Sequence, residues 1–367
     1  MSTFQLAGRF VRKYLLSQQA ILTWSVVFVL YLVLLHHASL LNFCRRCRIR
    51  LQVMLTGKYS TVISERISET EITAEKTKAS WELKKGNVGV YAIQGRRQHM
   101  EDRFNVVNDL EHTGTSIYGI FDGHGGEFAA DFVEKTLFKT IMVRLLKSAL
   151  NTTTKQNFSS ILTEEILYVD KQLLVPLYNS SSLLLSGTTG LVALLKGNQL
   201  TVANVGDSRG VMCTENGKAI PLSYDHKPQQ LKERKRIKES GGFISFNGVW
   251  RVAGVLATSR AFGDNPLKEK NLIIADPDIL NFDLKETKAQ FMILATDGLW
   301  DAFTNEEAVM YVKHRLDEPH FGAKSIVLQA YYRGSLDNIT VMVVNFKANQ
   351  TAVYNRKEHV EILVDLG

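Results

Sequence analysis

Five aspartates stand at or close to the ends of apolar runs that have the length of β-strands. They are Asp122, Asp207, Asp297, Asp301 and Asp337. Unpaired carboxylates that converge at one sheet edge repel one another strongly, so such a group needs cations to neutralise it. Oxygen ligands without a matching set of Cys and His residues favour the hard ions Mg²⁺ or Mn²⁺. Aspartates scattered over ordinary turns are the alternative, because Asp is common there.

The first of these aspartates is followed directly by Gly123 and His124. Gly123 lets the backbone turn sharply and brings its own carbonyl close to whatever Asp122 binds. His124 titrates near neutral pH, which suits a proton donor. Two ions bridged by one carboxylate lower the pKa of a shared water and clamp both ends of an in-line displacement. The stretch thus indicates metal-assisted hydrolysis, with a strand-end turn as the alternative.

A charged segment, 95–102, precedes this stretch. Arg97 can clamp a phosphate through its planar guanidinium, and Glu101 and Asp102 can hold metal-bound waters. The alternative is a solvated charged loop, which is the usual fate of such a run.

Apolar runs of strand length, alternating only over 88–93, predict the strands that position these side chains. The strands run over 88–93, 117–121, 191–195, 200–205, 291–295 and 339–344. Apolar residues at helical spacing predict two helices that cover a sheet, over 127–146 and 160–174. The basic run 232–238 is interpreted as the solvated face of a helix, with a partner-docking surface as an extension of that interpretation.

Composition indicates a globular chain with a basic N-terminal end. The 367 residues are 45% hydrophobic, which is enough for one large domain or two smaller ones. The net charge of +7 comes from residues 1–60, and the remainder has 36 basic against 37 acidic residues, so no nucleic-acid partner is expected. The three cysteines, Cys44, Cys47 and Cys213, imply no disulfide framework and fit a reducing compartment.

The run 20–41 is uncharged and mostly apolar, which predicts a transmembrane helix. A signal peptide would need a small-residue cleavage site, and a buried core helix would show a polar face. The arginines after the run mildly favour a cytosolic main domain. The predicted segments are a short N-terminal segment (1–19), the membrane helix (20–41), a basic juxtamembrane segment and tether (42–80), the main domain (81–347) and a tail (348–367).

Six motifs resemble those of the metal-dependent protein serine/threonine phosphatases, the protein phosphatase 2C family, and they occur here in the same order as in that family. They are RRQHMED (96–102), IYGIFDGHG (117–125), VANVGDSRG (202–210), SRAFGD (259–264), ATDGLWD (295–301) and DNITVMVV (337–344). The resemblance implies an α+β fold, a central sandwich of two mostly antiparallel β-sheets flanked by helix pairs. It implies two Mg²⁺ or Mn²⁺ ions and phosphorylated proteins as substrates, with a monomeric catalytic domain.

The resemblance also implies a role for each motif residue. Asp122 would bridge two metals, with the Gly123 carbonyl, Asp297 and Asp337 as further direct ligands. Asp207 and Asp301 match positions that can hold a weaker third metal. Glu101 and Asp102 would act through metal-bound waters, Arg97 would bind the substrate phosphate, and His124 would protonate the departing Ser or Thr oxygen. Membrane-bound members of the family suggest the endoplasmic reticulum.

Two other classes of protein compete with this interpretation. A cysteine-based phosphatase would need more than the bare spacing of Cys44 and Arg50, which lacks a glycine loop. A membrane-tethered scaffold with a phosphatase-like fold that only binds phosphoproteins is the alternative from a non-enzyme class. The intact Asp122, Asp297 and Asp337 argue against the scaffold.

Overall fold

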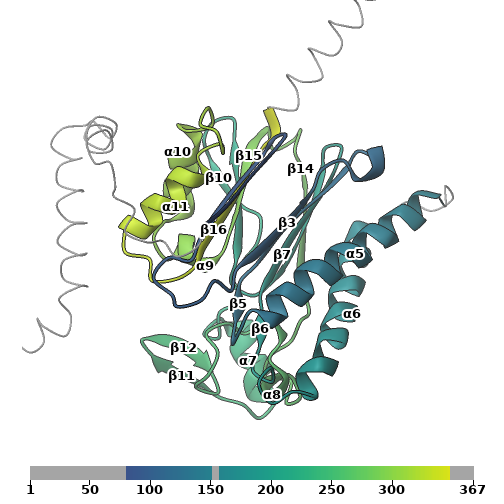
Figure 1. Cartoon of the computed structure of the whole chain (residues 1–367), viewed down its shortest axis with the longest axis vertical. Coiled ribbons are helices and arrows are strands. Elements are labelled where there is room, and N and C mark those ends of the chain that lie inside the picture. The colour runs from purple at the N-terminus through teal and green to yellow at the C-terminus, as the bar shows by residue number, and fades with distance from the viewer. Residues whose placement is uncertain (1–79, 151–156, 348–367) are drawn as a thin grey trace, which may run out of the picture. The chain divides into compact units, whose positions relative to one another are not determined.

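The structure is a computed structural model that describes residues 80–150 and 157–347 (Figure 1). The membrane helix predicted over 20–41, the tether after it and the tail from residue 348 lie outside the described residues and stay predictions. In the described part, no helix is both long enough and apolar enough to cross a bilayer.

Two antiparallel sheets form the middle of the fold. The first has the strand order β1-β2-β16-β15-β9-β10, and the second has the order β14-β8-β7-β4-β3. The strands of the first are β1 (Ser80–Lys85), β2 (Val88–Ile93), β9 (Arg209–Thr214), β10 (Ala219–Pro221), β15 (Ala289–Ala295) and β16 (Ile339–Asn345). Those of the second are β3 (Arg103–Val107), β4 (Thr115–Phe121), β7 (Gly190–Lys196), β8 (Gln199–Val205) and β14 (Asp278–Asp283).

Side chains along these strands alternate between two buried clusters. In β4, Tyr118 and Ile120 belong to the cluster that joins the two sheets, whereas Ile117 and Phe121 belong to the cluster shared with helices. This is the period of two that a strand imposes on its side chains. Because both faces are covered, the strands read as nearly continuous apolar runs and end where polar residues begin.

Helix pairs cover both outer faces and give α-β-β-α layers (Figure 1). The pair on the second sheet is α5 (Phe128–Leu150) and α6 (Phe158–Tyr178), and the pair on the first is α10 (Asn305–Lys313) and α11 (Ala323–Tyr332). A 3₁₀ turn, η2 (Leu110–His112), precedes β4, and a short helix, α9 (Asp297–Trp300), follows β15. The predicted α+β fold with antiparallel sheets and flanking helices is confirmed.

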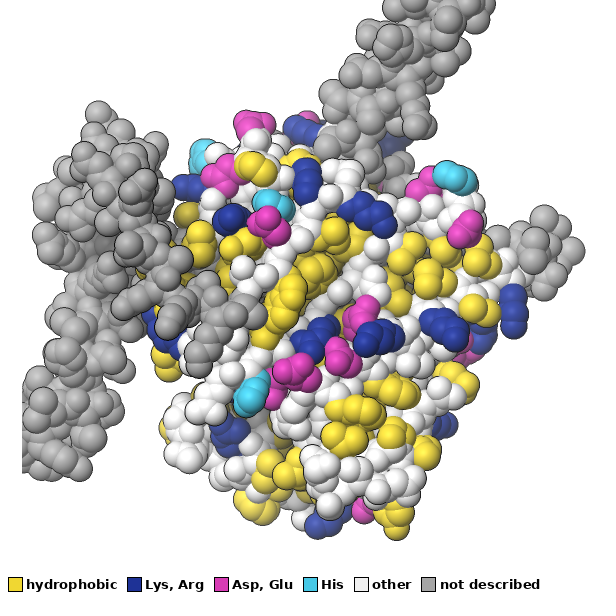
Figure 2. All heavy atoms as spheres, viewed as in Figure 1, with side chains coloured by type: hydrophobic (Ala, Val, Ile, Leu, Met, Phe, Trp, Pro, Cys, Tyr) yellow, Lys and Arg dark blue, Asp and Glu magenta, His cyan; other side chains and the backbone are white. Residues whose placement is uncertain are grey.

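Charged side chains tie the second sheet to α5. Arg103 of β3 pairs with Glu127 at 2.7 Å and with Asp131 at 2.6 Å. Figure 2 shows acidic and basic side chains side by side across the middle of this face. These contacts fix the start of α5, and therefore the loop between β4 and α5 that carries the DGHGG stretch.

Smaller elements gather at one end of the sandwich (Figure 1). They are β5 (Gly123–His124), β6 (Gly187–Thr188), α7 (Leu231–Glu239), β11 (Ile244–Asn247), β12 (Val249–Val252), β13 (Phe262–Gly263) and α8 (Asn265–Lys268). The strands β13, β6 and β5 pair as a small antiparallel sheet, and β11 and β12 form a hairpin.

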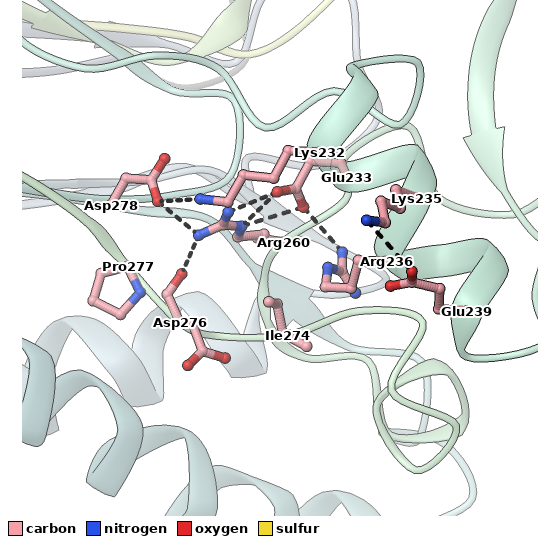
Figure 3. Close-up of a pocket in the computed structure, with 10 residues that line it drawn as sticks. All are labelled: Lys232, Glu233, Lys235, Arg236, Glu239, Arg260, Ile274, Asp276, Pro277 and Asp278. Atoms are coloured by element: carbon pink, nitrogen blue, oxygen red, sulfur yellow. Dashed lines mark hydrogen bonds and ion pairs between the residues drawn. The ribbon is translucent and has the colours of Figure 1, made fainter.

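The helix α7 is basic outside and acidic inside. Its Lys235 side chain is 74% exposed, whereas Glu233 is buried against Arg260, with 2.6 Å between carboxylate and guanidinium. Arg236 also pairs with Glu233 at 3.0 Å, and Arg260 pairs with Asp278 at 3.0 Å. Figure 3 shows these residues around a cleft of about 540 Å³. The run 232–238 is therefore a helix with a solvated basic face, as interpreted.

Candidate active site

The backbone of Asp122 is fixed between β4 and β5. Its N–H donates to Oγ1 of Thr189 at 3.1 Å, and its carbonyl accepts the N–H of Thr189 at 2.9 Å and the hydroxyl of Thr188 at 3.1 Å. A Cβ on the neighbouring Gly123 would lie 2.4 Å from the carbonyl oxygen of Glu101. Only glycine at position 123 therefore allows the chain at Glu101 to pass this close.

Asp122 and Asp297 stand at the centre of a group of carboxylates. Burial raises the pKa of both well above the usual range for aspartate. Neighbouring negative charges raise the pKa of Asp122 further, namely those of Asp297, Asp102, Asp337 and Asp207. The negative charges of Asp207, Asp337 and Asp301 raise the pKa of Asp297 in the same way. The folded chain thus brings the predicted aspartates into one electrostatic group, namely Asp102, Asp122, Asp207, Asp297, Asp301 and Asp337.

Asp102 is the most enclosed member of the group. Its Oδ2 accepts the hydroxyl of Thr340 at 2.7 Å and that of Thr296 at 3.0 Å. Burial raises the pKa of Asp102 to about 7, although both hydroxyls act in the opposite direction. Thr296 ties Asp102 to the start of α9, which carries Asp297. Thr340 ties it to β16, which begins shortly after Asp337.

Arg97 lies against the same group. Its Nη2 pairs with Oδ2 of Asp337 at 2.6 Å, while its side chain stays 57% exposed. Burial lowers the pKa of Arg97, but the charges of Asp337, Asp122 and Asp297 outweigh this and raise it. The guanidinium therefore faces the carboxylate centre and still reaches solvent, as a phosphate-binding group requires.

Asn338 holds the loop that carries Arg97 and Glu101. Its Nδ2 donates to the carbonyls of Gln94 at 2.7 Å and His99 at 2.9 Å, and its Oδ1 accepts the N–H of Glu101 at 2.8 Å. The carboxylate of Glu101 accepts the N–H of Gly126 at 3.0 Å. These bonds place Glu101 beside the DGHGG turn.

His124 pairs with Asp264, the last residue of the SRAFGD motif. Its Nε2 lies 2.8 Å from Oδ2 and 2.9 Å from Oδ1 of that carboxylate. Burial lowers the pKa of His124, but the charge of Asp264 outweighs it and the net change is upward. A Cβ on Gly187 would lie 2.2 Å from Oδ2 of Asp264 and 2.4 Å from Nε2 of His124, so this contact needs a glycine.

Lys227 is a cation that the sequence did not single out. Its Nζ pairs with Oδ2 of Asp207, and its charge also acts on Asp297 and Asp301. Asp301 is the exposed member of the acidic group.

The donor set fits a divalent cation by its chemistry. In the described part of the chain, no three His, Cys, Asp or Glu side chains are arranged to hold a metal ion. Two carboxylates are paired with cations of the chain instead, Asp337 with Arg97 and Asp207 with Lys227. Neither Asp122 nor Asp297 forms an ion pair with another described residue. Two partly buried carboxylates without a direct counter-ion are what a hard cation would stabilise.

The functional residues missed from the sequence are Asp264, Lys227, Asn338 and Thr189. Asp264 and Asn338 stood inside motifs that were recognised, but nothing in their spacing assigned them a contact. Lys227 lies on a loop, and only the fold shows that Asp207 is opposite it.

Solved structures share this fold. A "serine-threonine phosphatase 2C from Toxoplasma gondii" aligns with a TM-score of 0.64 at 23% identity, covering 73% of this chain and 99% of that chain. A structure described as a "C.elegans sex determining protein" aligns with a TM-score of 0.63 at 23% identity, covering 77% and 69% respectively. At these identities the likeness concerns the fold alone.

Sequence relatives lead to the family. "Protein phosphatase 1L" of Bos taurus is 50% identical over 353 residues, covering 95% of this chain and 96% of the relative. "Probable protein phosphatase 2C 59" of Arabidopsis thaliana is 42% identical over 267 residues, covering 72% and 81% respectively. The sequence model described as Protein phosphatase 2C matches residues 86–339. The chain belongs to the protein phosphatase 2C family and is a serine/threonine protein phosphatase.

Proposed function

We propose that the chain hydrolyses phosphoserine and phosphothreonine in proteins with the help of two Mg²⁺ or Mn²⁺ ions. The residues that would hold the ions are Asp122, the Gly123 carbonyl, Asp297 and Asp337. When bound, such ions supply positive charge, which lowers the pKa of a water and neutralises phosphoryl oxygens. The observation that carries this proposal is the pair of partly buried carboxylates, Asp122 and Asp297, that lack a direct counter-ion. A weaker third ion would use Asp207 and Asp301.

The chain's own residues then bind the substrate and move the proton. Arg97 holds the phosphate through its guanidinium, which exchanges Asp337 for phosphoryl oxygens. A water molecule loses one proton to the solvent, and its oxygen forms a bond to phosphorus as the bond from phosphorus to the Ser or Thr oxygen breaks. His124, oriented by Asp264, donates a proton to that departing oxygen. Glu101 orients water at the edge of the group.

Arg97 provides a direct test of substrate binding. Arg97→Ala should lower kcat/KM for a phosphothreonine peptide roughly 10- to 100-fold, because a charge-assisted contact to phosphate is lost. Arg96→Ala is the matched control, since Arg96 stacks 4.0 Å from the centre of the Tyr331 ring and donates to the Tyr331 carbonyl at 3.0 Å. Equal losses in the two variants would contradict the role of Arg97.

We further propose that residues 20–41 anchor the protein in a membrane, with the phosphatase domain in the cytosol and the endoplasmic reticulum as the site. The support is the uncharged apolar run and the four arginines that follow it, together with the small number of cysteines. If this is correct, alkaline carbonate should leave the full chain in the membrane pellet. Deletion of residues 1–41 should release it into the supernatant.

A further inference from the structure

The side chain of Lys227 lies inside the acidic group and is held by it. Its Nζ pairs with Asp207, whose side chain is 7% exposed against 29% for Lys227. The ammonium group of Lys227 therefore stands beside the two carboxylates proposed for a third ion: it pairs directly with Asp207, and its charge also acts on Asp301.

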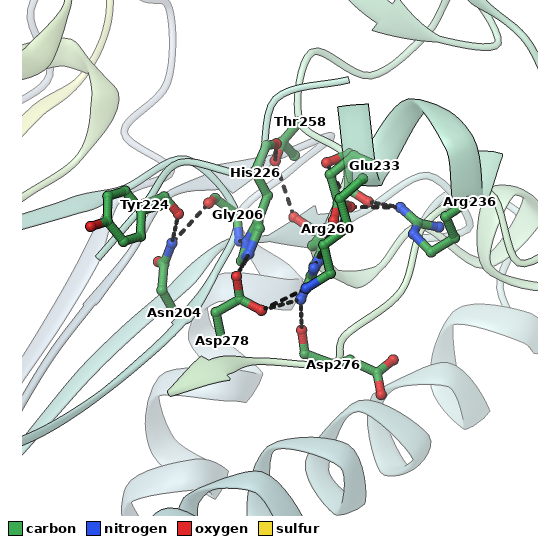
Figure 4. A network of polar contacts seen from close by, with 12 residues as sticks. Asn204, Gly206, Tyr224, His226, Glu233, Arg236, Thr258, Arg260, Asp276 and Asp278 are labelled. Carbon is green, nitrogen blue, oxygen red and sulfur yellow. Dashed lines mark hydrogen bonds and ion pairs between the residues drawn. The ribbon is translucent and has the colours of Figure 1, made fainter. Parts of the chain in front are cut away.

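Hydrogen bonds of the neighbouring residue, His226, fix the backbone position of Lys227. The N–H of Gly206 donates to Nδ1 of His226 at 3.0 Å, and the N–H of His226 donates to the Gly206 carbonyl at 2.9 Å (Figure 4). Asp207 and Lys227 are the next residues of these two segments. The two hydrogen bonds between Gly206 and His226 thus set the carboxylate of Asp207 and the ammonium group of Lys227 opposite each other.

A buried ion network fixes His226 in turn. Because Nδ1 accepts a hydrogen bond, Nε2 carries the proton, and it lies 3.1 Å from Oδ2 of Asp278. Asp278 pairs with Arg260, which pairs with Glu233 of α7 (Figures 3 and 4). The His226 carbonyl also accepts the hydroxyl of Thr258 at 3.0 Å. Because its neighbour His226 is held by these contacts, Lys227 has a fixed position, unlike a mobile surface lysine that pairs with any nearby carboxylate.

We propose that the ammonium group of Lys227 is the built-in cation of the Asp207 corner, so that the chain binds two divalent ions tightly and admits a third only when Lys227 leaves Asp207. The inference rests on the proposed metal-dependent function and adds a residue that controls the number of ions. A divalent ion between Asp207 and Asp301 would have to compete with the ammonium group for Asp207, and the two cations would repel each other. Lys227 is thus a positioning residue for the acidic group.

The test counts bound Mn²⁺ on the full chain in detergent, from the free Mn²⁺ signal in electron paramagnetic resonance. Wild type should bind two ions tightly, and Lys227→Met should bind three, the third at least tenfold more tightly than wild type binds it. Lys227→Arg should behave like wild type. Lys232→Met is the matched control, because Lys232 is 77% exposed and lies 3.5 Å from Asp278, outside the acidic group.

The Tm with and without Mn²⁺ is a second readout, which distinguishes a change in ion binding from a failure to fold. Without metal, Lys227→Met leaves Asp207 unpaired, so its Tm should fall below that of wild type, and Mn²⁺ should raise it by more than it raises the wild-type Tm. Lys227→Gln, which can still donate a hydrogen bond to Asp207, replaces Lys227→Met if that variant does not fold. The same third ion is expected in it.

The outcomes separate the two proposals. Two tightly bound ions in both wild type and Lys227→Met overturn the role of Lys227 and leave the proposed function standing. Three equally tight ions in wild type do the same. No tight Mn²⁺ binding to any folded variant overturns the proposed function and this inference with it.

Discussion

At the scale of single residues, the site separates the group that binds phosphate from the group that gives a proton. Arg97 reaches solvent beside Asp337, whereas His124 is paired with Asp264. The Asp264 carboxylate orients the ring and favours its protonated form, which is the form that a general acid needs. The pairing gives His124 a role that can be tested apart from binding.

His124→Gln should lower kcat for a phosphothreonine peptide by about 10²- to 10⁴-fold, because the alkoxide of threonine needs a proton as it departs. An aryl phosphate with a good leaving group needs no such proton, so its hydrolysis should fall much less. Steady-state kinetics on both substrates give the comparison. Equal losses on the two substrates would mean that His124 supports the structure and does not donate the proton.

At the scale of elements, the junction of α7 with the segment before β13 carries a buried pair of opposite charges, Glu233 and Arg260. Burial raises the pKa of Glu233, but Arg260 and Arg236 outweigh it and bring the pKa down to about 2. A carboxyl whose folded pKa lies below its unfolded value adds stability above the unfolded pKa and loses it as pH falls through the folded one. The network should therefore hold α7 and His226 in place at neutral pH and release them in acid.

Glu233→Gln should cost about 3 kcal/mol of unfolding free energy at pH 7, where the charged pair is intact, from the shift of the pKa between 4.5 and about 2. The difference from wild type should shrink as pH falls from 4.5 toward 2. Urea unfolding at a series of pH values measures it. A constant difference over that range would show that the ion pair does not contribute in this way.

The sequence predicted those elements whose residues alternate between two buried clusters. The strand predicted over 88–93 is β2, and the run 291–295 lies within β15, because both faces of these strands are covered. The hairpin β11–β12 was missed although Asn247-Gly248 is a turn signal and Gly248 has φ +72°. Its strands have four residues each and expose Phe246 and Val249, so they show no buried period.

The site was predicted as a set of residues but not as a set of contacts. Asp122 and Asp297 could be found because apolar strands end beside them. Their partners could not, since Lys227 meets Asp207 only after two loops fold together. Long-range pairing of this kind leaves no period in the sequence.

At the scale of the whole molecule, the proposed orientation across a membrane can be checked with the chain's own acceptor triplets. Asn157 and Asn179 begin such triplets and are exposed. Asn338 also begins one, but it is 5% exposed and its Nδ2 donates two hydrogen bonds, so it cannot carry a glycan in the folded domain.

With the phosphatase domain in the cytosol, the full chain expressed in cells should show no change in gel mobility on treatment with a glycosidase. The matched variant replaces the four acceptor asparagines other than Asn338, namely Asn151, Asn157, Asn179 and Asn349, with Gln and should migrate like wild type. A glycosidase shift that this quadruple variant abolishes would place the domain in the lumen and contradict the proposed localisation.

We propose that the carboxylate group serves metal-dependent hydrolysis, and turnover of a phosphothreonine peptide by the full chain tests this proposal. Released phosphate is measured with Mn²⁺ and with a chelator, for wild type, Asp297→Asn and the exposed control Asp317→Asn. We expect turnover that needs Mn²⁺, falls by at least about 10²-fold in Asp297→Asn and stays unchanged in Asp317→Asn. Turnover that persists in chelator, or a folded wild-type chain that binds the phosphopeptide without hydrolysing it, would contradict the account.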